Sequence, residues 1–340
     1  MSIVNWYVDR TIQAIITIFG VITLSFGLIR LMPGGPMQFL RAQLLQAGGG
    51  GGVSQQRLNE LITIYMNVQP EKPLLQSYLN YMTSVLTGDL GKSFWYNEPV
   101  LDILTRALPW TIFIMSVSII ISFGIGITLG ALLAYNEGSR FDVGMSSLAT
   151  FLNSIPFYVV AVLLLYFVGY GTGWFPTSGR YNLAIEPGWS LAFLGSVLYH
   201  AILPVSSFVI TAFGMQALTM RGNSISVLGE DYLRVARLRG VPANRIALRY
   251  VGRNAMLPMY TGLMISIGFL FGGSIILEQI FQYPGVGYYL FKAIKARDYA
   301  LMMGGFLVIT VAVVISIFIA DLTYGMIDPR ASGGDSRESY

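Results

Sequence analysis

Cysteine is absent from this chain of 340 residues, histidine occurs once, and charged residues make up only 11% of it. Without cysteine the chain forms no disulfide, no thiolate-bound zinc site and no iron–sulfur cluster. One histidine, His200, is too few for a histidine-rich metal site and argues against a serine–histidine relay. Soluble domains are about one-quarter charged. The composition therefore excludes a soluble enzyme, a disordered protein and a nucleic-acid-binding protein.

Long uncharged runs take the place of the missing charges, and hydrophobic residues are 54% of the chain. A bilayer core about 30 Å thick needs roughly 20 apolar residues in a helix, because a helix satisfies its own backbone hydrogen bonds in lipid. We therefore predict an all-α integral membrane protein with six transmembrane helices. The six runs are Thr11–Ile29, Ala107–Tyr135, Val143–Tyr170, Tyr199–Met220, Leu257–Leu277 and Ala300–Ala320.

The distribution of basic residues predicts the orientation of these spans. Six spans place both termini on one side, and with the N-terminus inside, the inner segments carry eleven arginines against four lysines or arginines in the short outer loops. The segment from Arg30 to Arg106 is too long to count in this rule. We expect both termini to be cytoplasmic.

The long outer segment has helical signals of its own. A linker, Gly48–Gly52, precedes Ser54, which can cap a helix. Pro73 can begin a second one. Their apolar faces are formed by Leu58, Leu61, Ile62 and Tyr65 in the first and by Leu75, Leu79, Met82 and Leu86 in the second. The pair is either a small cap packed on the outer membrane face or a contact for a protein that delivers a solute.

The inner loop Arg221–Asn254 has a net charge of +5, which exceeds the +4 of the whole chain. A short helix fits Glu230–Arg239, since acids open it and arginines follow in the order that a helix dipole favours. Gly240 ends this helix, and a second helix over about Ala243–Met256 leads into the fifth span. The loop is either a basic segment that orients the protein and touches anionic lipid, or an element that docks in a groove on a soluble partner.

Small residues favour the docking interpretation of this loop. Ala236 and Gly240 are four residues apart and predict a bare stripe that a partner can approach closely. The stretch EDYLRVARLRG, followed by RYVGRNAMLP, resembles the EAA loop of type I ABC-transporter permeases. The resemblance is to the first permease subunit of the dipeptide/oligopeptide/nickel branch. Four further stretches agree in order, namely LIRLMPGGP, GDLGKSFWYNEPV, EQIFQYPGVGYYLFKAIKARDY and DLTYGMIDPR.

The chain departs from the family motif at one point. Arg234 stands where the first glutamate of the motif would be, so Glu230 is not given that glutamate's role. The resemblance implies a type I ABC importer transmembrane domain with an extracytoplasmic helical insertion after the first helix. It divides the chain into a first helix (1–31), an extracytoplasmic segment (32–106), a permease core (107–324) and a cytoplasmic tail (325–340).

The resemblance also implies partners: a second permease subunit, one or two ABC ATPase subunits and an extracytoplasmic solute-binding protein, in the lipid bilayer of a prokaryotic cell membrane. The sequence holds no phosphate-cradling G-x-x-x-x-G-K-[ST] loop. ATP and Mg²⁺ then belong to the ATPase subunits, and this chain is a permease with no catalytic residue, metal or cofactor of its own. The expected substrate is a dipeptide or oligopeptide, with nickel chelates or oligosaccharides as the alternative, moved by alternating access.

Two groups of site residues follow. The ATPase-coupling residues implied by the resemblance are Glu230, Asp231, Tyr232, Arg234, Ala236, Arg237 and Gly240. Polar residues in or beside the spans are candidates for the translocation path or for bonds between helices, namely Asn153, Ser154, Gln216 and Glu278. For Glu278 the alternative is a carboxylate that reaches water at the membrane edge. A secondary transporter is disfavoured, because the middle of the spans holds no acidic or basic residue.

Glycines and prolines in the spans bear on how the helices pack. Gly126 and Gly130, and likewise Gly268 and Gly272, are spaced to let helices approach closely. They serve either static packing or a sliding seam between two permeases. Prolines that can kink spans are Pro109, Pro156, Pro204 and Pro258.

Overall fold

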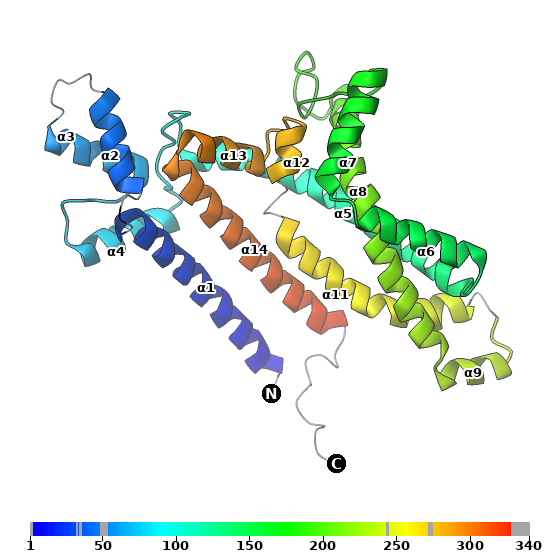
Figure 1. Cartoon of the computed structure of the whole chain (residues 1–340). Helices are drawn as coiled ribbons and strands as arrows, with labels where there is room; N and C mark the ends of the chain where they lie inside the picture. The colour runs from blue at the N-terminus through cyan, green and yellow to red at the C-terminus, as the bar shows by residue number, and fades with distance from the viewer. Residues whose placement is uncertain are drawn as a thin grey trace. The chain divides into compact units, whose positions relative to one another are not determined.

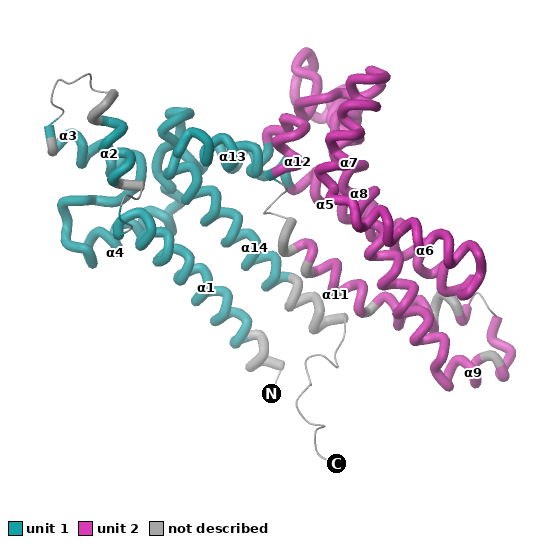
Figure 2. Tube along the Cα trace, viewed as in Figure 1, with its two compact units in different colours: residues 1–111, 271–275, 285–340 teal, residues 112–270, 276–284 magenta. Residues whose placement is uncertain are grey.

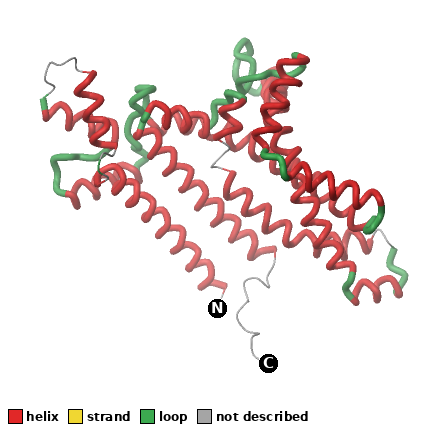
Figure 3. The backbone as a smooth tube through the Cα atoms, viewed as in Figure 1, coloured by secondary structure: helices red, strands yellow, loops and turns green. Residues whose placement is uncertain are grey.

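The computed structural model describes residues 3–31, 33, 36–47, 54–242, 245–270 and 275–327. Helices form nearly all of the regular structure in these ranges (Figure 3), and the one β-bridge among them joins Lys92 and Pro99. The described chain divides into two compact units, residues 1–111, 271–275 and 285–340 in the first and 112–270 and 276–284 in the second (Figure 2).

Four helices are long and apolar enough to cross a membrane, and they confirm four of the predicted spans. They are α1 (Ile3–Leu31), α5 (Val100–Tyr135), α8 (Leu191–Leu228) and α14 (Tyr299–Ile327), labelled in Figure 1. Pro109 and Pro204 lie inside α5 and α8, which continue through them.

The third predicted span, Val143–Tyr170, is broken at Pro156, one of the prolines expected to kink a span. Helix α6 (Arg140–Asn153) and the segment formed by α7 (Phe157–Leu163) and π-helical η1 (Leu164–Tyr170) meet at 89°. Pro156 causes the break, because proline has no N–H to continue the ladder and keeps the residue before it out of the helical region. The pair is a broken span or a re-entrant loop.

The predicted fifth span, Leu257–Leu277, corresponds in part to α11 (Arg253–Leu270), which is not among the described helices long and apolar enough to count as a candidate span. The second helix predicted over about Ala243–Met256 is helical over its described residues, as a π-helical segment, η2 (Ile246–Gly252), that runs into α11. The predicted end of the fifth span, Leu277, lies in a separate short helix, α12 (Ile275–Ile280), and residues 271–274 between the two helices, Gly272 among them, lie outside the described residues. The short helix α13 (Val286–Ala296) follows.

The first unit is built on α1 and α14. Around them lie three helices of the segment between the first two spans, α2 (Pro36–Ala47), α3 (Gln55–Met66) and α4 (Leu74–Leu86). Their common core is formed by Ile22, Phe26, Ile29, Leu40, Ile62, Met66, Val68, Tyr81 and Leu307. Ser54 caps α3 as predicted, since its Oγ accepts the Arg57 N–H at 3.2 Å.

Helix α4 presents its faces in an unexpected way. Ser77 and Tyr81 are its buried residues. The predicted apolar face is largely uncovered, with Leu75, Leu79 and Leu86 between 54% and 70% exposed. Periodicity thus found the leucine stripe, but this stripe does not pack on the rest of the chain.

Asp298 joins two of the motif stretches within the first unit. Its carboxylate accepts bonds from Ser93 Oγ at 2.5 Å and from the Trp95 N–H at 3.0 Å. The other oxygen accepts the Leu301 N–H at 3.1 Å and so caps α14. Asp298 is only 1% exposed. The carboxylate therefore anchors the loop before the second span to the start of the last one.

The second unit is built around α8, which packs against α5, α6, α7 and α11. Gly126 and Gly130 bring α5 directly onto α8, because a Cβ on Gly130 would lie 2.4 Å from the Ala217 carbonyl oxygen. Gly214 of α8 makes an equally close approach to Ala149 of α6. The glycine pair of α5 thus serves packing within the chain, the first of the two expectations.

Candidate functional site

The predicted inner loop follows α8, a helix longer than a bilayer core is thick. At 1.5 Å per residue its 38 residues are about 57 Å long, nearly twice the thickness of a bilayer core. Helix α9 (Asp231–Leu238) follows within three residues of the end of α8. Asp231 in its first turn interacts favourably with the helix dipole. The predicted short helix is therefore confirmed, one residue shorter at each end.

One face of α9 packs on its own chain. Leu233 and Ala236 are 1% and 5% exposed and form a cluster with Ile246 and Val251. We call these four residues the loop core. Burial of their side chains holds α9 against η2, the segment that leads into the fifth span.

The opposite face of α9 is uncovered. It carries Asp231, Arg234, Val235 and Leu238, and we call these four residues the outer face of α9. Val235 is 48% and Leu238 81% exposed. A face that combines uncovered aliphatic side chains with charges at its edges is suited to a protein contact rather than to bulk water.

Gly240 forms the C-terminal cap of α9. Its φ of +69° is left-handed, and the Val241 N–H donates to the Ala236 carbonyl at 3.1 Å. This is a Schellman cap, in which the residue after the left-handed position also packs back on the helix, as Val241 does on the loop core. The predicted bare stripe is therefore wrong: Ala236 is buried, and Gly240 is needed for its backbone conformation.

The remaining predicted coupling residues surround this element. Glu230 is exposed immediately before α9. Tyr232 is 39% exposed, and its hydroxyl accepts a hydrogen bond from Asn254 Nδ2 at 2.8 Å, which connects α9 to α11. The Arg237 side chain lies outside the described residues.

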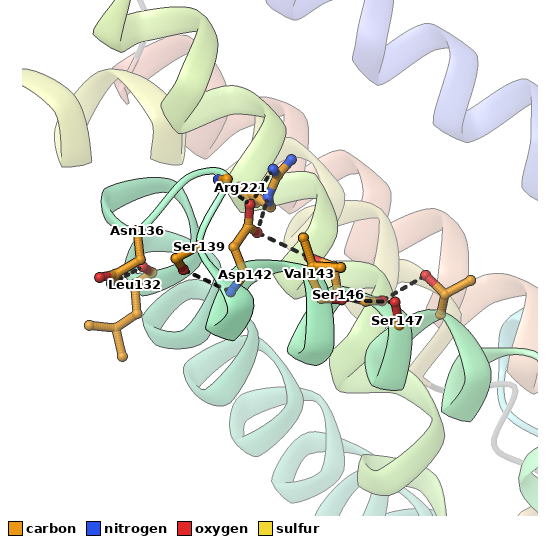
Figure 4. Close-up of polar contacts among 10 residues, drawn as sticks. Leu132, Asn136, Ser139, Asp142, Val143, Ser146, Ser147 and Arg221 are labelled. Atoms are coloured by element: carbon orange, nitrogen blue, oxygen red, sulfur yellow. Dashed lines mark hydrogen bonds and ion pairs between the residues drawn. The ribbon is translucent and has the colours of Figure 1, made fainter.

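An ion pair that the sequence analysis missed lies at the same end of the unit (Figure 4). Arg221 Nε and Nη2 donate to the two oxygens of Asp142 at 2.6 and 2.7 Å, a bidentate arrangement that is among the stronger charged hydrogen bonds. Asp142 is 2% exposed and also accepts the Gly138 N–H at 3.0 Å. The pair joins the first turn of α6 to α8 at the place where Gly130 of α5 also meets α8.

A signal for this pair was present in the sequence. Asp142 and Arg221 stand at the inner ends of the third and fourth predicted spans, and a carboxylate and a guanidinium that leave the same side of a membrane on neighbouring helices can pair. Periodicity alone does not show which helices are neighbours, so the pairing needed the fold.

The predicted path residues lie on separate elements of the second unit. Asn153 and Ser154 are exposed at the bend between α6 and α7, where Ser154 Oγ donates to the Thr150 carbonyl at 2.9 Å. Gln216 is half-buried where α8 meets α5. Glu278 of α12 is 1% exposed, so the prediction that its carboxylate reaches water is wrong. The Glu278 side chain is buried within the unit. The Tyr283 N–H donates to the backbone carbonyl of Glu278 at 2.8 Å.

No group of three or more metal-binding side chains is present among the residues that the structure describes. What the site offers is mechanical. Helix α9 is held by the loop core on one face and is bonded to α11. It follows directly on α8, whose C-terminal part is paired with α6 through Arg221 and Asp142.

Comparisons with known proteins agree with this arrangement. The family of binding-protein-dependent transport system inner membrane components matches residues 126–333. The di/tripeptide transport system permease protein DppB of Pseudomonas aeruginosa is 30% identical over 327 residues, covering 92% of this chain and 94% of that protein. The oligopeptide transport system permease protein AppB of Bacillus subtilis is 31% identical over 329 residues, covering 96% of this chain and 98% of that protein.

Solved structures show the fold. An inward-facing structure of the MetNI methionine ABC transporter has a TM-score of 0.53 at 16% identity, and the match covers 66% of this chain and 96% of that one. A bacterial ABC transporter involved in the import of the polysaccharide alginate gives 0.52 at 15% identity, covering 66% and 79%. Since the family model spans more than half of the sequence and relatives about 30% identical span nearly all of it, this multi-pass membrane protein belongs to the binding-protein-dependent inner membrane components, the permease subunits of ABC importers.

Proposed function

We propose that this chain is a permease subunit that imports short peptides, powered by ABC ATPase subunits and supplied by an extracytoplasmic solute-binding protein. Two observations support the peptide substrate: the relatives are named for dipeptide, di/tripeptide and oligopeptide transport, and they match over nine-tenths of the chain. ATP and Mg²⁺ would be held by the ATPase subunits, and the termini would be cytoplasmic, which puts α9 on the side where ATP is available.

The contact with the ATPase is the outer face of α9. The observation that carries this assignment is Leu238, an aliphatic side chain 81% exposed at the tip of a helix whose other face is buried in the loop core. Covering Leu238 and Val235 in a groove removes apolar area from water. Asp231 and Arg234 border the same face and fix the register of the contact.

Movement of the ATPase reaches the spans through contacts that are already rigid. The loop core transmits it to η2, and the bond from Asn254 to Tyr232 transmits it to α11. Arg221 passes motion of α8 to α6 through Asp142. Closure of two ATPase subunits would then bring the inner ends of two permeases together, as alternating access requires. Asn153, Ser154 and Gln216 are the side chains that we assign to the path, with Glu278 as a buried residue beside it.

Crosslinking tests the contact directly, because the chain has no cysteine of its own. We would place single cysteines at Val235 and Leu238 and purify the complex with its ATPase subunits. A control cysteine at Glu137 lies in the exposed turn between α5 and α6, at the same end of the unit. Val235→Cys and Leu238→Cys should crosslink to the ATPase, and Glu137→Cys should crosslink far less.

The same complexes should then be assayed in liposomes. Leu238→Asp should uncouple ATP hydrolysis from peptide uptake while the chain still inserts. Equal crosslinking at all three positions, or full uptake by Leu238→Asp, would refute docking through the outer face of α9. Uptake of a solute other than peptides, with docking intact, would refute only the substrate.

A further inference from the structure

The uncovered leucines of α4 form a single stripe. At 100° per residue, Leu75, Leu79 and Leu86 fall within about 40° of one another on the helix. They are 70%, 54% and 68% exposed. Gln76 and Thr83 are also exposed but lie together on a neighbouring polar stripe. Helix α4 itself carries no charged residue, and charges resume at Lys72 before it and Asp89 after it.

The position of α4 against α1 determines what surrounds this stripe. Arg30, at the end of the first span, donates to the Pro70 carbonyl at 2.9 Å. Eight residues later, Tyr78 lies further down α1: its ring is 5.3 Å from that of Phe26 and 6.5 Å from that of Phe19. The Tyr78 and Thr23 hydroxyls are 2.7 Å apart. Figure 1 shows α4 beside the end of α1 that is remote from the N-terminus.

These contacts show how far along the first span α4 lies. Thr23 is seven residues inside Arg30, or about 10 Å along the axis of α1. Thr23 Oγ1 already donates to the Phe19 carbonyl, so the Tyr78 hydroxyl donates to Thr23 and both hydroxyls are satisfied. Such pairing is what polar groups require at the level of the hydrocarbon, where no water replaces a missing partner.

We infer that α4 is embedded in the outer leaflet, with its leucine stripe in the hydrocarbon and Gln76 and Thr83 turned toward the headgroups. The occupant of the uncovered face is lipid. The stripe is continuous with a membrane span, lies beside the apolar half of that span, and offers no charge or hydrogen-bonding group to a protein. An uncharged helix with one apolar side is typical of an interfacial helix. Only the choice of leaflet rests on the orientation proposed above.

Spin labels measure this depth. Single cysteines at Leu75, Leu79 and Leu86 would each carry a nitroxide, with Gln76 and Thr83 as matched controls on the same helix. The full chain would be reconstituted in vesicles of phosphatidylcholine and phosphatidylglycerol. The rest of the chain leaves all five side chains uncovered, so the labels are not expected to disturb folding.

Collision rates with oxygen, which concentrates in hydrocarbon, and with a water-soluble nickel chelate give the result. At the leucine positions the ratio of oxygen to nickel collisions should exceed that at Gln76 and Thr83. Equal ratios at all five positions would mean that the stripe faces water and would overturn the inference. Protection of the leucine positions from both reagents would show a protein on the stripe, a second copy or a binding protein, and would equally overturn it. Neither outcome bears on the docking of α9.

Discussion

Replacing Gly130 by alanine should separate α5 from α8. A Cβ at this position would lie 2.4 Å from the Ala217 carbonyl oxygen, 2.6 Å from Met220 Cβ and 3.0 Å from the Arg221 backbone nitrogen. Two of these three atoms are backbone atoms of a long helix and cannot rotate away. Ordinary contact distances begin near 3.5 Å, so one helix must move by on the order of 1 Å.

The size of the effect follows from two opposing terms. Inserting a methyl group into a packed contact costs about 1–3 kcal/mol. Replacing glycine within a helix returns up to about 1 kcal/mol. We expect a net loss of about 1–2 kcal/mol, a factor of roughly 5 to 30 in the ratio of folded to unfolded protein. The neighbouring Arg221 should also shift away from Asp142. We therefore expect peptide uptake to fall even at temperatures where the variant is still folded.

Gly124→Ala is the matched control. Gly124 lies in the same helix, and a Cβ there would meet nothing within 4 Å. Thermal unfolding of the purified chain in one detergent should give Gly124→Ala a melting temperature at or above that of the parent, with Gly130→Ala several degrees below it. If the two variants melt together, the close approach of α5 to α8 is refuted, together with the explanation of why glycine stands at residue 130.

Three further predictions concern the inner loop and its ion pair. Gly240→Val should lower the coupling of ATP hydrolysis to uptake because its φ is left-handed, whereas Gly240→Asn, which tolerates that conformation, should retain most of it; equal losses would refute the cap. Asp142→Arg should abolish uptake, and adding Arg221→Asp should restore part of it; the absence of any rescue in liposome assays would refute a coupling role for the pair. Ala236→Arg should expose the loop to protease because the position is buried, and exposed Val235→Arg should not; equal digestion of both would contradict the loop core.

Much of the helical architecture could be predicted from the sequence, because uncharged runs of about 20 residues have few alternatives in a membrane. The runs that became α1, α5, α8 and α14 were found in this way. The break at Pro156 was harder to predict, since the same residue type lies within α5 and α8, where the helix continues. What distinguishes Pro156 is that α6 already ends before it: the Ile155 N–H donates to the Leu152 carbonyl, three residues back, at 3.1 Å, and composition does not show this.

The position of α9 was predicted correctly, but the face of it that is uncovered was not. Small residues at Ala236 and Gly240 suggested a bare surface, yet α9 is apolar on both sides, with Leu233 inward and Leu238 outward. A helical wheel cannot choose between two apolar faces. The choice is made by η2, which supplies Ile246 and Val251 to one of them.

Helix α4 shows why this ambiguity is general in membrane proteins. In water, an apolar stripe indicates the side of a helix that faces the core. In lipid both sides of a helix find an apolar environment, so the stripe loses that meaning, and close packing selects small residues instead. Ser77 of α4 is fully buried while Leu75 is 70% exposed, and serines are likewise buried on the long spans, among them Ser118 of α5 and Ser207 of α8. On α4 the small residue Ser77 therefore lies on the packed side of the helix, and the leucines lie on the side that we place in lipid.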